Sequence, residues 1–130
     1  MSDRIAQELD LLRKYYPDVA YREDGRWVRI PAYPLSAGWN RESSDVAFRI
    51  KVEYPGTPPY GFFVPAGLRC NGQSPGSYSE PAGEQPPFGG TWGMFSWQVA
   101  DRWFPTADVV TGSNLLSFAR SFADRFREGV

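Results

Sequence analysis

The chain has 130 residues, of which 42% are hydrophobic and 16% aromatic, which is enough for one domain over residues 1–130 with its own core. Its formal net charge of -1 argues against a nucleic-acid binder, which usually carries a basic surplus. No apolar run is long enough to span a membrane, and the N-terminus opens into a charged helix and not a signal peptide. The only cysteine, Cys70, forms no internal disulfide, and these features together favour the cytoplasm.

The sequence contains no histidine. Ser-His-Asp and Cys-His catalysis are therefore excluded, and the commonest metal ligand is missing. No glycine-rich phosphate loop of the Walker or Rossmann kind is present either. We accordingly expect neither a metal site nor a cofactor.

The first half of the chain predicts a helix followed by three strands. Residues 3–16 place apolar side chains at helical spacing, and Pro17 ends the helix. Residues 18–33 form two β-type runs around Asp24-Gly25, a strong hairpin signal. Residues 46–52 then alternate apolar and polar side chains, which predicts a strand with one buried face and one face in water.

A fourth strand is expected over residues 60–64, and the link that leads to it is rich in proline. This link contains Tyr54-Pro55 and the pair Pro58-Pro59. Each proline fixes φ and removes a hydrogen-bond donor, so no strand ladder can continue through this stretch. The link should therefore be a stiff corner.

The second half predicts a long loop and a closing helix. Residues 65–93 are rich in glycine and proline, and an aromatic segment follows from Trp92 to Phe104. Residues 113–128 form an amphipathic helix. The fold class is therefore α+β: an N-terminal helix, a four-stranded antiparallel meander, a long loop and a C-terminal helix.

This order of elements resembles the ubiquitin-conjugating E2 (UBC-like) superfamily. E2 domains typically pass from their third strand to their fourth through a Tyr-Pro turn and a proline pair, and Tyr54-Pro55 and Pro58-Pro59 match that pattern. Trp103-Phe104-Pro105 is similar to the tryptophan and proline that precede the next E2 helix. The chain is most similar to the divergent prokaryotic E2 family E of bacterial ubiquitin-like modification systems.

The resemblance implies a role in ubiquitin-like protein conjugation, with an E1-like adenylating enzyme and a ubiquitin-like protein as partners. The usual E2 chemistry needs a His-Pro-Asn motif and a later cysteine that carries the partner as a thioester. Here the histidine is missing, Cys70 comes earlier than expected, and Asn71 follows the cysteine. Cys70 and Asn71 are the candidate catalytic pair, but enzyme activity is left open by the sequence.

Two other interpretations remain open for this chain. One is a non-catalytic binding module that holds a ubiquitin-like protein, and the other is a structural subunit that docks a larger assembly through its Trp-rich loop. Trp92, Trp97 and Trp103 are the candidate binding residues, because aromatic side chains are enriched at interface hot spots. Large aromatics also dominate small cores, so a core role is expected for two of the three.

Overall fold

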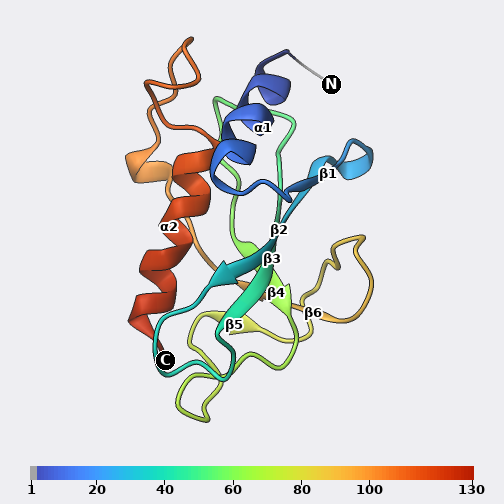
Figure 1. Cartoon of the computed structure of the whole chain (residues 1–130), viewed down its shortest axis with the longest axis vertical. Helices are drawn as coiled ribbons and strands as arrows, with labels where there is room; N and C mark the ends of the chain where they lie inside the picture. Colours follow the sequence, from blue (N-terminus) through green and yellow to red (C-terminus); the bar gives the residue numbers. More distant parts are fainter. Residues whose placement is uncertain (1–2) are drawn as a thin grey trace.

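The computed structural model describes residues 3–130 and has two α-helices around one antiparallel sheet (Figure 1). The helices are α1 (Asp3–Tyr15) and α2 (Leu115–Glu128), and two short 3-10 turns cover Asp24–Arg26 and Ala100–Arg102. The strands are β1 (Ala20–Arg22), β2 (Trp27–Pro34), β3 (Ser43–Arg49), β4 (Phe62–Pro65), β5 (Tyr78–Ser79) and β6 (Trp92–Phe95). The α+β class is thus confirmed, and no helix within residues 3–130 is long and apolar enough to cross a membrane.

The sheet has six strands, in the order β1-β2-β3-β4-β6-β5, so the predicted number of four is wrong. Strand β5 lies within the predicted loop over residues 65–93, and β6 begins at the end of that loop and continues into the aromatic segment. The reason lies in β4, which pairs with β3 only at Ala47↔Phe63. Strand β6 pairs with β4 along its whole length, from Phe62↔Phe95 to Pro65↔Trp92, and so provides hydrogen-bond partners for the second edge of this buried strand.

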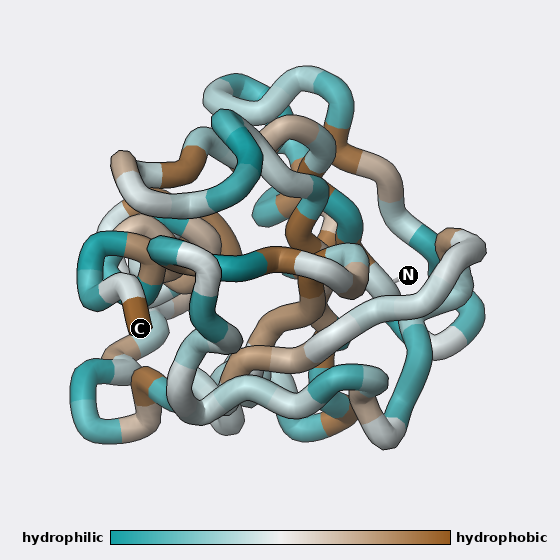
Figure 2. The backbone as a smooth tube through the Cα atoms, turned by 90° about the horizontal axis from the view of Figure 1, so that it is seen from below, coloured by the Kyte–Doolittle hydropathy of each residue, from teal (hydrophilic) through white to brown (hydrophobic). Residues whose placement is uncertain are grey.

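The two helices cover one face of the sheet, where the main core lies. Figure 1 shows α1 and α2 side by side, and Figure 2 shows hydrophobic segments through the middle of the molecule and hydrophilic ones around its edge. Phenylalanines dominate this core. The rings of Phe62 and Phe122 stack with their centroids 4.1 Å apart, and Phe48 packs edge-on against Phe118 at 5.2 Å. Such close aromatic packing fixes α2 on the sheet.

The alternation in residues 46–52 had predicted that the opposite face of the sheet is open to water. This prediction is wrong for part of that face. Ala47, on that face, is fully buried, because the segment after β5 folds back over it. A second, smaller core forms there from Trp27, Ala47, Phe63, Ala82 and Trp92. The glycine- and proline-rich segment therefore has a structural function, since it covers the second face of β3 and β4.

We predict that Phe122→Ala lowers the free energy of unfolding by about 3–5 kcal/mol, because it opens a cavity among packed aromatic rings. Urea unfolding measures this loss. Phe104→Ala is the matched control: the Phe104 side chain is 72% exposed, so the change should be within about 0.5 kcal/mol. Equal losses in the two variants would contradict this description of the core.

Candidate functional site

Cys70 lies in the segment after β4 and is buried, with 3% of its surface exposed. Its backbone forms isolated bridges with Trp39 and Gln73. The sulfur faces two glycines, since a Cβ built on Gly38 or on Gly129 would lie 3.4 Å from Sγ. The thiol is thus enclosed by the turn around Gly38 and by the end of α2. Attack on a bound partner requires these segments to move apart.

The cation near Cys70 is Arg125 of α2. Arg125 is buried, lies 4.8 Å over the ring of Phe95, and donates hydrogen bonds to the carbonyl oxygens of Gly129 at 2.8 Å and Gly76 at 2.7 Å. Burial lowers the pKa of Arg125, while the carboxylate of Glu128 acts in the opposite direction. The sequence could have indicated the burial of Arg125, because this residue lies between Phe122 and Phe126 on the apolar side of α2.

Arg69 precedes Cys70 in the chain, and a neighbouring cation favours a thiolate, but the charge of Arg69 is already paired. Its guanidinium Nη2 lies 2.7 Å from Oε2 of Glu80. Glu80 also accepts a hydrogen bond from the backbone N–H of Gly67 at 2.6 Å and one from the hydroxyl of Tyr78 at 2.7 Å. These contacts bind the segment after β4 to β5. Glu80 therefore stabilises a loop and leaves Arg69 little electrostatic effect on the thiol.

Asn71 is next to Cys70 in the chain, and its side-chain oxygen lies beside Gly38, as the Cys70 sulfur does. It has a left-handed backbone conformation with φ 50°, and its N–H donates to the carbonyl oxygen of Gly38 at 2.7 Å. Its side-chain oxygen is also the atom nearest to a Cβ built on Gly38. The residue is exposed, whereas Cys70 is buried. The two candidates thus lie together, but they do not form an open site for a reacting carbonyl.

The three candidate tryptophans lie in or against the two cores. Trp92 belongs to the smaller core and donates from Nε1 to the carbonyl oxygen of Gly89 at 2.7 Å. Trp103 is buried and donates to the carbonyl oxygen of Pro55 at 2.6 Å. Trp97 is half-buried and donates to Ser121 Oγ at 2.9 Å. Each indole N–H already has an internal partner, so these side chains do not form one exposed binding surface.

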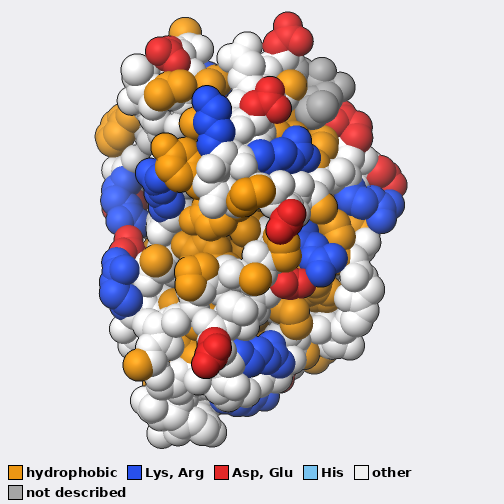
Figure 3. Space-filling model, viewed as in Figure 1, with side chains coloured by type: hydrophobic (Ala, Val, Ile, Leu, Met, Phe, Trp, Pro, Cys, Tyr) orange, Lys and Arg blue, Asp and Glu red, His pale blue; other side chains and the backbone are white. Residues whose placement is uncertain are grey.

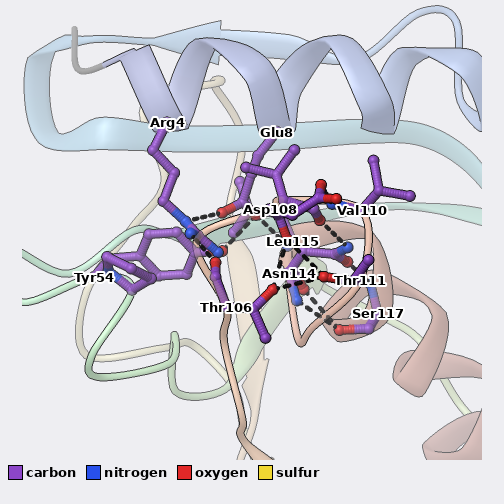
Figure 4. A network of polar contacts seen from close by, with 12 residues as sticks. Arg4, Glu8, Tyr54, Thr106, Asp108, Val110, Thr111, Asn114, Leu115 and Ser117 are labelled. Carbon is purple, nitrogen blue, oxygen red and sulfur yellow. Dashed lines mark hydrogen bonds and ion pairs between the residues drawn. The ribbon is translucent and has the colours of Figure 1, made fainter.

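A buried carboxylate, Glu8, connects three parts of the fold (Figure 4). Its Oε2 accepts from Arg4 Nε at 2.8 Å. Its Oε1 accepts from the Tyr54 hydroxyl at 2.5 Å and from the backbone N–H of Leu115 at 2.6 Å. Burial and the neighbouring Glu8 carboxylate raise the pKa of Tyr54 well above its usual range, so Tyr54 remains a proton donor. Glu8 thus joins α1, the proline-rich corner and the start of α2.

The two motifs that carry the family resemblance contact each other at this place. The Tyr54 and Trp103 rings lie 5.9 Å apart, and Trp103 Nε1 donates to Pro55, as described above. The sequence had not indicated Glu8. The sequence could have indicated the burial of Glu8, because this residue lies on the apolar side of α1, next to Leu9 and one turn before Leu12. An acid at such a position needs buried donors.

Comparisons of the chain with protein-family models, with curated proteins and with solved structures found no significant match. Within residues 3–130, no group of three or more histidine, cysteine, aspartate or glutamate side chains is placed to hold a metal ion. Function must therefore be inferred from the contacts around Cys70 and around Glu8.

We predict that Glu8→Gln lowers the free energy of unfolding by about 2–4 kcal/mol, measured by urea unfolding. The amide loses the charge that pairs with Arg4, and its NH2 group faces donors. Asp10→Asn is the control, because Asp10 lies on the same helix but is exposed, and it should change stability by less than about 0.5 kcal/mol. An unaltered stability in Glu8→Gln would show that the network is not important for the fold.

Acid should weaken the loop that Glu80 organises. The hydrogen bonds from Arg69 and then from Gly67 lower the pKa of Glu80 to about 2. A folded-state pKa below the unfolded value adds stability above the unfolded pKa, and that stability is lost as the pH falls toward about 2. Glu80→Gln should therefore lose less stability between neutral and acid pH than the wild type, as urea unfolding can measure. Asp101→Asn, which removes an exposed carboxylate, should keep the wild-type pH dependence.

Proposed function

We propose that the chain is a divergent E2-like component of a bacterial ubiquitin-like protein conjugation pathway, which binds a ubiquitin-like protein and an E1-like enzyme without carrying a thioester on Cys70. The UBC-like assignment is supported by the contact between the Tyr54-Pro55 corner and Trp103. It is also supported by the placement of both helices on one face of an antiparallel sheet (Figure 1).

The burial of Cys70 carries the non-covalent part of the proposal. A carrier cysteine must present its sulfur to the thioester on the E1-like enzyme and afterwards to an acceptor amine. Here the sulfur packs against the backbones of Gly38 and Gly129, and Cys70 belongs to the main core. A free cysteine in such surroundings behaves as a small apolar residue. The thiol thus contributes packing, and binding of the partner is left to the surface.

A role as a docking subunit through the Trp-rich loop has less support. Two of the three indole rings are buried, and all three N–H groups donate to internal oxygens, as described above. Hot-spot tryptophans at an interface present their rings to the partner, so this surface would have to be made by other side chains.

The test reconstitutes the pathway from genes that neighbour the one for this chain. The purified E1-like enzyme, the ubiquitin-like protein, ATP and the chain are mixed and separated on a gel without reducing agent. We expect a thioester on the E1-like enzyme and none on the chain, together with measurable binding of the ubiquitin-like protein that Cys70→Ser leaves unchanged. The thioester on the E1-like enzyme is the internal control for activity.

Thiol accessibility is the second measurement on the same samples. Cys70 should react slowly with a disulfide reagent in the folded chain and at least about tenfold faster after denaturation, because the fold encloses the sulfur. An adduct on the chain that a reducing agent removes, and that Cys70→Ser abolishes, would overturn the non-covalent proposal. A chain that binds neither partner would overturn the conjugation role itself.

A further inference from the structure

The surface between α1 and α2 contains a groove with a volume of about 480 Å³. Figure 3 shows a face of the molecule on which hydrophobic side chains gather, with basic and acidic side chains around them. The apolar lining of the groove comes from three segments: Leu11 and Tyr15 of α1, Val110 of the loop before α2, and Leu116 of α2. Tyr15 is 54% exposed and Val110 66% exposed, so apolar surface that does not belong to the core is accessible to solvent here.

The positive charge of Arg120 lies in this groove. The guanidinium of Arg120 lies 4.4 Å over the ring of Tyr15, and Arg120 has no carboxylate partner among residues 3–130. The other charged side chain that lines the groove is Asp124, and Asp124 is ion-paired with Arg127. Arg120 therefore offers its fork of donors to a group from outside the chain, and a carboxylate is the group that fits it best.

The loop that presents Val110 is held in place by its own hydrogen bonds (Figure 4). The backbone N–H of Val110 donates to Asp108 Oδ1 at 3.0 Å, and the Asn114 amide donates to the carbonyl oxygen of Val109 at 2.7 Å. The hydroxyls of Thr106 and Thr111 lie 2.8 Å apart across the loop. An exposed apolar side chain on a fixed loop loses little conformational entropy when a partner covers it.

We propose that this groove docks a short segment of a partner protein that presents an aspartate or glutamate next to apolar side chains. The carboxylate pairs with Arg120, and the apolar neighbours cover Tyr15 and Val110. The charge disfavours a basic segment, which Arg120 would repel. Docking at this place does not involve Cys70, so the inference is independent of the proposed conjugation role.

The test selects random peptides displayed on phage against the whole chain and then measures the binding of the selected peptides by calorimetry. We expect enriched sequences with an acidic residue beside apolar ones. Arg120→Gln should weaken their binding about tenfold or more, because a charged hydrogen-bonded pair is lost. Val110→Asp should also abolish binding, since it replaces exposed apolar surface of the groove by a charged side chain that repels the acidic residue of the peptide. The controls are Arg102→Gln and Val52→Asp, which change exposed residues of the same types outside the groove and should leave binding unchanged.

Thermal unfolding of each variant shows that the fold is retained, as the exposure of Val110 and Arg120 leads us to expect. Enrichment of basic peptides, no enrichment at all, or binding that Arg120→Gln leaves unchanged would overturn the proposal. Concentration-dependent dimerisation that Val110→Asp abolishes would also overturn it, because a second copy of the chain would then be the occupant.

Discussion

The buried carboxylate of Glu8 is the constraint on which the arrangement of this fold depends. A carboxylate without solvent needs donors, and Glu8 receives one from its own helix, one from the proline-rich corner and one from the first turn of α2. The donor from α2 is a backbone N–H that no bond within the helix can satisfy, so Glu8 assists the cap that Asn114 provides. Helices α1 and α2 are thereby fixed relative to each other and to the sheet.

This arrangement explains how a loop-rich chain keeps a defined shape. The proline-rich corner has no ladder of its own, and it is held instead by Glu8 through Tyr54 and by Trp103 through Pro55. The segment after β4 is held in the same manner, with Glu80 collecting donors from Gly67, Arg69 and Tyr78. In both places one carboxylate satisfies several donors that the irregular backbone and its side chains supply. Buried or paired carboxylates thus hold these irregular segments in place, where no helix or strand ladder does so.

The same packing decides which surface is available to a partner. The face of the sheet opposite the helices is partly covered by the segment that contains Ala82 and Trp92, and the thiol of Cys70 is enclosed by the turn at Gly38 and the end of α2. The groove between the helices is different, because Tyr15 and Val110 remain exposed there beside Arg120. Partner binding at this groove and a buried cysteine are compatible with one non-covalent E2-like component.

The sequence by itself determined the elements whose signals are local. Helical spacing and Pro17 defined α1, Asp24-Gly25 defined the first hairpin, and the amphipathic pattern before Gly129 defined α2. These signals depend on neighbours within a few residues, so a single sequence suffices to read them. The proline-rich corner was also predictable, since proline removes donors wherever it lies.

Tertiary structure alone decided the strands β5 and β6, the burial of Cys70 and the roles of Glu8, Glu80 and Arg125. Strand β6 is short and contains Gly93, and it exists because β4 needs a second pairing partner. Cys70 is buried by Gly38 and Gly129, which are distant from it in sequence. Glu8 and Leu115, which are 107 residues apart, meet only in the folded chain. Contacts of this kind leave no local pattern, because each depends on where the rest of the chain packs.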